Sequence, residues 1–293
     1  MIMLKEYLGK KELEAALELT QGIPELLFIH HSIKNYYMNH YPCNELRIFS
    51  YPFENPIYWF LVDLQKNACP AIHLAQNCDF HDRFVFLTAA TQFLGELEML
   101  VDYKKISIST ELHLIHDLSS LLHEFFSDHQ PVSRVPFTVF YMSDDQIEDC
   151  NKLDVTLPYG FTFSKLDVSE AAKLVHCKTN DDSIALIGDR IRYLPSVCIR
   201  HANSGDIVTH ELCSSRGDML NLYTHPDNRR QGLASAAEIK LAQRIIRENG
   251  RPFKAVPNHL TSIILSSEGS PFWTIWSRSS TPVQFTVTCF EKC

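Results

Sequence analysis

The sequence lacks the cysteine spacing that marks a disulfide framework or a zinc site. Its nine cysteines are scattered from Cys43 to Cys293 and form no CxxC pattern. Disulfide-rich secreted domains carry an even set of patterned cysteines, and structural zinc sites use closely spaced cysteines and histidines. We therefore expect a reducing compartment and no bound metal.

Positive charge is also scarce. The chain has 27 lysines and arginines against 35 aspartates and glutamates, which gives a formal net charge of -8 at pH 7. General nucleic-acid binders concentrate lysine and arginine because these side chains displace counterions from phosphates. The charge balance therefore excludes this class of protein, and an anionic ligand must be held by a local group of basic residues.

Long apolar runs are absent as well. No segment approaches the ~18 apolar residues of a membrane span, and the N-terminal residues lack the apolar core of a secretory signal. Import signals are rich in arginine and poor in acids, whereas this end carries Glu6, Glu12 and Glu14. We expect no membrane partner and a location in the cytoplasm or the mitochondrial matrix.

Length and composition indicate a folded chain of two units. Hydrophobic residues make up 45% and charged residues 21%, as in ordinary globular proteins. The 293 residues exceed the roughly 150 that one domain commonly contains. Residues 143–149 are acidic and poor in strand-forming side chains, so they predict a linker between residues 1–148 and residues 151–293.

Helical and strand-like patterns alternate in both halves, which predicts a mixed α/β fold. Helical apolar spacing occurs at residues 10–19, 24–33, 93–101, 112–126, 168–177 and 182–193. Runs of β-branched and aromatic residues predict strands at residues 46–51, 57–64, 83–87, 105–109, 136–142 and 161–166, a hairpin of residues 196–201 and 206–213, and an aromatic, strand-like run at 270–276.

The most informative stretch is a predicted strand at residues 218–224, a loop, and a helix at residues 233–249. The helix has one apolar stripe, and Asn249, Gly250 and Pro252 terminate it. The start of the helix is thereby fixed next to the loop.

An anion-binding site is expected at the start of this helix. The first backbone N–H groups of a helix have no intrahelical partner and lie at the positive end of its dipole, so they can bind a pyrophosphate. Arg229 and Arg230 add positive charge, and Gly232 lets a phosphate approach the backbone closely.

The run Arg229-x-x-Gly232-x-Ala234 resembles the R/Q-x-x-G-x-G/A motif with which GNAT acyltransferases hold the pyrophosphate of coenzyme A. As in those proteins, the run follows a strand and opens a helix, and Pro226 and Asp227 precede it. Over nearly its full length the chain is similar to the glycine N-acyltransferase-like proteins of this superfamily, with supporting residues at 194–199, 217–219 and 224–233.

The resemblance implies an α/β (α+β) protein of two domains. The C-terminal domain would have the GNAT fold, with a mixed, mainly antiparallel sheet flanked by helices. The N-terminal domain would be a mixed unit like that of the family, and it could be a degenerate GNAT-like copy. The implied coenzyme A contacts are Leu222, Tyr223, Thr224, Arg229, Arg230, Gln231, Gly232, Leu233, Ala234 and Asn258.

The resemblance also implies a reaction. An acyl group would pass from acyl-CoA to the amino group of an amino acid such as glycine, by direct attack of the amine on the thioester. Two alternatives stay open: a non-catalytic relative that binds coenzyme A, and an N-acetyltransferase that acts on a protein or polyamine amine. Acyl-CoA is the expected co-substrate, and no metal is expected.

The amine must lose a proton before it attacks the thioester. Family members carry a carboxylate on the strand before the coenzyme A loop, and the matching residue is Asp218 in place of the usual Glu. In an extended strand Asp218, Leu220, Leu222 and Thr224 share one face. Asp218 is interpreted as the catalytic base or, alternatively, as a polar residue at the end of the strand.

The acid that protonates the departing thiolate is not evident. Many GNAT enzymes use a Tyr in the helix after the next strand, but residues 258–267 contain no Tyr. Ser266 and Ser267 are candidate donors through water, and two serines that merely end a helix are the alternative.

The remaining histidines and cysteines do not predict a metal site. His30 and His31 are adjacent in a helical stretch, so their side chains diverge, which favours a half-buried pair. His210 and Cys213 are three apart in a strand and point to opposite faces.

Overall fold

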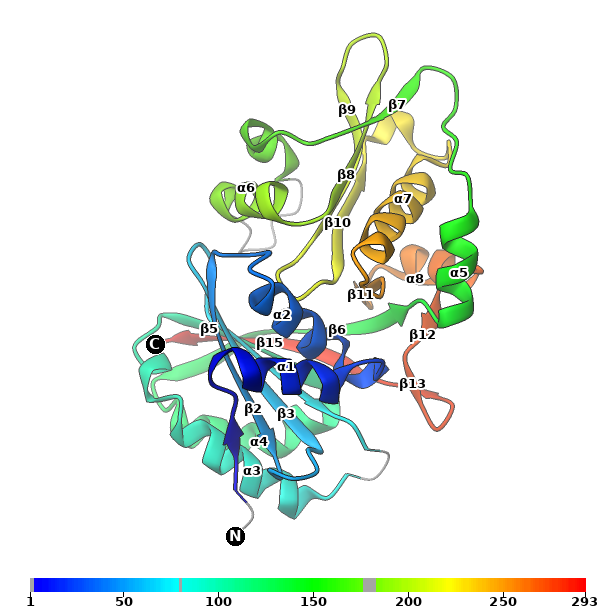
Figure 1. The fold of residues 1–293 in the computed structure, drawn as a ribbon. Coiled ribbons are helices and arrows are strands. Elements are labelled where there is room, and N and C mark those ends of the chain that lie inside the picture. Colours follow the sequence, from blue (N-terminus) through cyan, green and yellow to red (C-terminus); the bar gives the residue numbers. More distant parts are fainter. Residues whose placement is uncertain (1–2, 79–80, 176–182) are drawn as a thin grey trace.

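The computed structural model describes residues 3–78, 81–175 and 183–293. One sheet of thirteen strands runs through both halves of the chain, with helices on its faces (Figure 1). Most neighbouring strands are antiparallel, which confirms the predicted α/β (α+β) class. None of the helices in the described residues is long and apolar enough to cross a membrane.

The N-terminal half contains a set of neighbouring strands whose two faces are both covered by helices. Its strands are β1 (Lys5–Glu6), β2 (Asn44–Tyr51), β3 (Tyr58–Gln65), β4 (Ala71–Gln76), β5 (Lys105–Glu111) and β6 (His129–Tyr141). Its helices are α1 (Gly9–Thr20), α2 (Leu27–Tyr37), α3 (Arg83–Gly95) and α4 (Leu112–Phe125), with short 3₁₀ turns η1 (Pro24–Leu26) and η2 (Glu98–Leu100). Helices α1 and α2 pack on the face of Trp59 and Leu61, and α3 and α4 pack on the face of Phe60.

The C-terminal half is built in the same way. Its strands are β7 (Phe161–Ser164), β8 (Ser196–His201), β9 (Ile207–Cys213), β10 (Met219–Thr224), β11 (Phe253–Pro257), β12 (Thr274–Ile275), β13 (Ser277–Arg278), β14 (Thr281–Pro282) and β15 (Phe285–Lys292). Its helices are α5 (Asp144–Lys152), α6 (Ile184–Tyr193), α7 (Leu233–Arg247) and α8 (Thr261–Glu268), with η3 (Val168–Leu174) and η4 (Pro226–Asn228). Helix α7 packs on the face of Met219, and α6 and η3 pack on the face of Leu220.

The two halves exchange strands at the centre of the sheet. The strand order is β1-β2-β3-β4-β5-β15-β6-β11-β10-β9-β8-β7, and β12 pairs with one end of β6. The last strand, β15, therefore lies between β5 and β6, while β6 pairs with β11 of the C-terminal half. Figure 1 shows β15 and β6 side by side across the middle of the molecule, where its lower and upper parts meet. The sheet is continuous because of this exchange.

Residues 83–87 are helical, and the predicted strand there is wrong. They open helix α3, because the Asp82 carboxylate accepts hydrogen bonds from the N–H groups of Phe84 at 2.9 Å and Val85 at 3.1 Å. This N-cap outweighs the β propensity of the aromatic run.

The helix predicted at residues 93–101 is only the end of α3 followed by η2, and strand β4 was not predicted.

The predicted linker at residues 143–149 is also helical. It forms the start of α5, where Ser143 and Gln146 make a reciprocal capping box. The predicted helix at residues 168–177 is a 3₁₀ segment as far as Leu174, and the predicted helix at 182–193 is α6; residues 176–182 lie outside the described residues. Of the strand-like run 270–276, only β12 is a strand.

Candidate functional site

Strand β10, turn η4 and helix α7 form the strand, loop and helix that the sequence predicts. Gly232 is the N-cap residue of α7 and has a φ of 78°, a left-handed conformation that glycine adopts without steric cost. Arg229 folds back on the loop, where its Nε donates to the carbonyl oxygen of Thr224 at 3.0 Å. No described side chain caps the helix, so its first N–H groups are available to an anion.

Strands β10 and β11 separate from each other next to this loop. They pair in parallel at Met219 and Lys254, and the described chain has no further pair between them. A bulge at Asn221, which has a φ of 56°, bends β10 and shifts its register against β9. A gap therefore opens from Met219 toward Thr224, that is, toward the start of α7.

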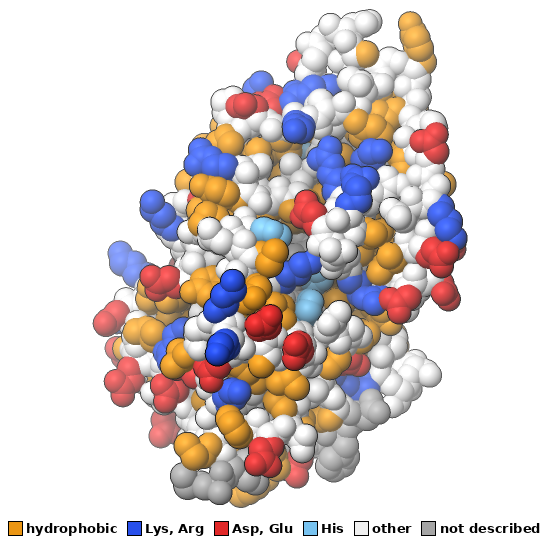
Figure 2. Space-filling model, in the orientation of Figure 1, with side chains coloured by type: hydrophobic (Ala, Val, Ile, Leu, Met, Phe, Trp, Pro, Cys, Tyr) orange, Lys and Arg blue, Asp and Glu red, His pale blue; other side chains and the backbone are white. Residues whose placement is uncertain are grey.

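A cavity of about 740 Å³ lies along this gap. Its walls include all the predicted coenzyme A contacts except Gln231 and Asn258. Asn258 lies after β11, where its Oδ1 accepts a hydrogen bond from Thr138 at 3.0 Å. Figure 2 shows a group of Lys and Arg side chains over the part of the molecule where α7 lies, so this acidic protein has a local concentration of positive charge.

The inner end of the cavity holds a buried ion pair that the sequence analysis did not find. Lys254 Nζ donates to Glu238 Oε1, and both side chains line the cavity. The indole N–H of Trp273 donates to the other oxygen of Glu238 at 2.9 Å, and Lys254 Nζ lies 4.3 Å from the centre of the Trp273 ring. A lysine within an otherwise apolar strand was the only sequence signal for this pair.

Glu211 of β9 lies near this pair. Its carboxyl group is fully buried, and its Oε2 has no hydrogen-bond partner among the described residues. Burial first, and then the charge of Glu238, raise the pKa of Glu211 well above its usual range, while Lys254 opposes this shift. The neutral form of Glu211 is therefore favoured, and Lys254 is left with Glu238 as its charged partner.

Asp218 lies just before β10, at the end of the gap where β10 and β11 meet. Its side chain accepts a hydrogen bond from the hydroxyl of Ser214, and its Oδ1 lies 3.8 Å from Nε of Arg216. The residue is 6% exposed and does not line the cavity. The bulge also breaks the predicted alternation, so Leu222 points to the opposite face from Asp218.

The turn that carries Asp218 inserts into the N-terminal half. Ser215 Oγ donates to the buried Asp63 at 2.9 Å, and Arg216 donates to Ser109 Oγ at 3.1 Å. A Cβ on Gly217 would lie 2.5 Å from the Cβ of His31, so only glycine fits there. The turn is held by α2, β3 and β5 of the other half.

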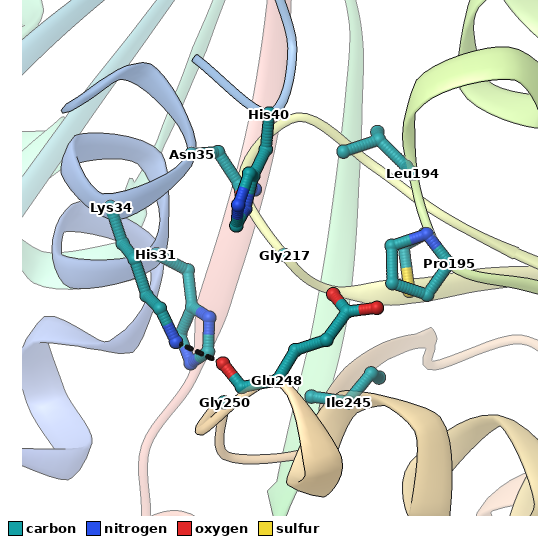
Figure 3. Close-up of a pocket in the computed structure, with 11 residues that line it drawn as sticks. His31, Lys34, Asn35, His40, Leu194, Pro195, Gly217, Ile245, Glu248 and Gly250 are labelled. Carbon is teal, nitrogen blue, oxygen red and sulfur yellow. Dashed lines mark hydrogen bonds between the residues drawn. The ribbon is translucent and has the colours of Figure 1, made fainter. Parts of the chain in front are cut away.

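A second, small cavity lies at this contact between the halves (Figure 3). It has a volume of about 30 Å³, enough for about one water molecule. His31 and Lys34 of α2 face Glu248 at the end of α7, and Lys34 Nζ donates to the Glu248 carbonyl oxygen at 2.6 Å. The cavity is too small for a coenzyme.

The remaining predicted candidates are two serines at the end of α8 and the buried His31. Ser266 and Ser267 line the large cavity from α8, but the Ser267 hydroxyl donates to the carbonyl oxygen of Ile263 at 2.9 Å, as serines at helix ends do. His31 is buried, more completely than predicted. The described residues contain no group of three or more side chains that could hold a metal ion.

No protein-family model matches the sequence, and no curated protein matches it. Among solved structures, the chain is similar to a protein from Drosophila, with a TM-score of 0.71 and 13% identity over 98% of each chain. It is also similar to a tandem GNAT protein from the clavulanic acid biosynthesis pathway, with a TM-score of 0.55 and 10% identity over 99% of this chain and 98% of the other.

A GCN5-related N-acetyltransferase from Sphaerobacter thermophilus gives a TM-score of 0.51 and 8% identity, over 98% of this chain and 95% of the other. At sequence identities this low, structural similarity indicates a shared fold but does not indicate a shared substrate. The whole described chain therefore has the fold of GCN5-related N-acetyltransferases, as the motif of Arg229, Gly232 and Ala234 predicts.

Proposed function

We propose that the chain is an acyl-CoA-dependent N-acyltransferase that binds its coenzyme between β10, β11 and the start of α7. The observation that carries this proposal is the cavity of about 740 Å³ that begins at the uncapped N-terminus of α7. The pyrophosphate accepts hydrogen bonds from the first N–H groups of α7, and Arg229 and Arg230 balance its charge. The pantetheine arm follows the gap toward Met219.

The proposed acceptor is the amino group of an amino acid such as glycine, by similarity to the glycine N-acyltransferase-like proteins. The amine attacks the thioester carbonyl carbon, the C–N bond forms, and the C–S bond breaks with coenzyme A as the leaving group. Asp218 is the proposed base for the ammonium proton. Its place beside the junction of β10 and β11 supports this role, because the pantetheine arm ends there.

A non-catalytic coenzyme A-binding protein is the second candidate. Two observations favour it: α8 has no Tyr to protonate the thiolate, and Asp218 does not line the cavity. An N-acetyltransferase acting on protein or polyamine amines is the third.

A two-stage assay separates the three candidates. Acetyl-, benzoyl- and longer acyl-CoAs are first tested for a shift in melting temperature, and thiol release is then measured with single amino acids, peptides and polyamines. The proposal predicts a shift and amino-acid-dependent thiol release. A shift without turnover identifies the binding protein, turnover only with peptides or polyamines identifies the third candidate, and no shift with any acyl-CoA contradicts all three.

A further inference from the structure

The buried pair of Lys254 and Glu238 occupies the closed end of the coenzyme gap. Lys254 pairs with Met219 at the point where β11 meets β10, so it lies at the inner limit of the gap between these two strands. Its side chain is 7% exposed, and that of Glu238 is 14% exposed. Burying a cation costs free energy unless it has a charged partner. A buried lysine on the wall of a cavity is therefore suited to interact with a negative charge that forms in the cavity during a reaction.

The distance along β10 places Lys254 near the reacting sulfur. The stretch from Thr224, beside the pyrophosphate loop, to Met219 spans roughly 17 Å at about 3.3 Å per residue. An extended pantetheine arm has a similar reach, so a coenzyme held at Gly232 delivers its sulfur to the Met219 end. This step rests on the proposed function.

We propose that Lys254 is the catalytic acid that protonates the departing coenzyme A thiolate. When the tetrahedral intermediate collapses, the C–S bond breaks and its electron pair goes to sulfur, which takes a proton from the Lys254 ammonium. The nitrogen of the new amide loses its remaining extra proton to the base or to solvent. Solvent then returns a proton to Lys254, so the enzyme ends the cycle unchanged.

The surroundings of Lys254 suit a donor that must be held in place. An ammonium has three N–H groups, and the bond to Glu238 uses one of them. Trp273 fixes the second oxygen of Glu238 and covers Lys254 with its ring. Glu238 is thus a positioning residue. The other charged groups on the cavity wall, Arg229 and Arg230, lie at the opposite end, at the loop that opens α7.

This assignment supplies a donor in place of the tyrosine that α8 lacks. Of the two serines predicted as donors, Ser267 donates to the Ile263 carbonyl oxygen, and Ser266 lines the cavity beside it. Lys254 comes from β11 instead of α8, so it reaches the inner end of the gap from the neighbouring strand.

The proposal is tested on full-length protein loaded with coenzyme A. The pKa of the bound coenzyme A thiol is measured from the ultraviolet absorbance of its thiolate, with protein loaded with desulfo-coenzyme A as the blank. A cation within contact distance favours the thiolate, so Lys254→Met should raise this pKa by about 1–3 units. Acyl-CoA affinity should change only severalfold, and single-turnover acyl transfer should fall roughly 10²- to 10⁴-fold.

Three further variants sharpen the test. Lys240→Met removes a lysine of α7 that does not line the cavity, and it should leave affinity, thiol pKa and turnover unchanged. Lys254→Arg keeps the charge but not an easily released proton, so it should keep the lowered thiol pKa and lose turnover. Lys254→Met/Glu238→Gln avoids an unpaired buried carboxylate and serves if the single variant does not fold.

An unchanged thiol pKa in a folded Lys254 variant that still binds coenzyme A would overturn the proposal, and so would full turnover by Lys254→Arg. Failure of the unaltered protein to bind coenzyme A would instead remove the proposed function itself. The two failures are therefore distinguishable.

Discussion

At the scale of single residues, Asp218 is the proposed catalytic base and also lies in the contact between the two halves. Its carboxylate is held by Ser214 beside Arg216, in a turn fixed by the N-terminal half. Asp218→Asn keeps the size and removes the base, so turnover should fall roughly 10²- to 10⁴-fold with little change in acyl-CoA affinity. Steady-state kinetics and calorimetry measure the two quantities separately.

Higher pH should partly rescue Asp218→Asn, because free amine then becomes available from solution. Asp218→Glu restores the residue that the similar family uses, and it should retain activity. Near-normal turnover of Asp218→Asn at neutral pH would show that the base lies elsewhere.

His31 makes the contact between the halves sensitive to acid. Burial, with smaller contributions from the charges of His30, Lys34 and Arg251, lowers the pKa of His31 to about 3. The unfolded chain takes up this proton below about pH 6.5, and the folded chain does not. Stability should therefore fall as the pH drops from about 6.5 toward 3, by about 1.4 kcal/mol per pH unit for this group.

Urea unfolding at several pH values measures this slope. His31→Gln removes the titrating group, so its unfolding free energy should depend less steeply on pH below about 6. His30 and His113, whose pKa values burial lowers to about 4, still titrate in the variant and leave a residual slope. Parallel pH curves for the variant and the unaltered protein would show that His31 takes up its proton in the folded state.

At the scale of elements, α3 connects the parallel strands β4 and β5 as α7 connects the parallel strands β10 and β11, but the two helices start differently. Helix α7 opens with Gly232 and no side-chain cap, whereas α3 opens with Asp82, whose carboxylate already binds the first N–H groups. A carboxylate there repels a phosphate and takes its hydrogen bonds. We therefore expect one coenzyme A per chain by calorimetry, and a stoichiometry of two would contradict this difference.

The sequence patterns correctly predicted those helices and strands whose formation depends mainly on interactions between residues close in the chain. Helix α7 has a long apolar period and a clear end at Asn249, so it was found with its motif. The start of α3, residues 83–87, was mistaken for a strand because its aromatic residues favour strands, while the deciding cap at Asp82 is one side chain. The bulge at Asn221 carries no pattern of its own, and it moved Leu222 to the other face.

At the scale of the whole molecule, the strand exchange could not be read from the sequence. The neighbours of β15 are β5 and β6, which precede it by more than a hundred residues, and no local pattern records such a pairing. The ion pair of Lys254 and Glu238 was not predicted for the same reason, because its two residues lie on a strand and a helix that come together only in the folded chain. The proposed division at residues 148–151 falls inside α5.

The exchange should make the halves unfold together. Phe285 at the start of β15 is buried and stacks on Phe28 of α2, with ring centres 5.2 Å apart. Phe285→Ala should cost about 3–5 kcal/mol and lower one common transition in scanning calorimetry. Two transitions, with only one of them shifted, would show that the halves unfold independently.

The central claim is that coenzyme A binds at the start of α7, and titration of acetyl-CoA into Gly232→Glu tests it most directly. Gly22→Glu is the matched control, because both glycines have a left-handed φ, 78° and 74°, and open space for a Cβ. A carboxylate facing the pyrophosphate should weaken binding by about 100-fold or more in Gly232→Glu, with affinity unchanged in Gly22→Glu. Equal affinity in two folded variants would contradict the account.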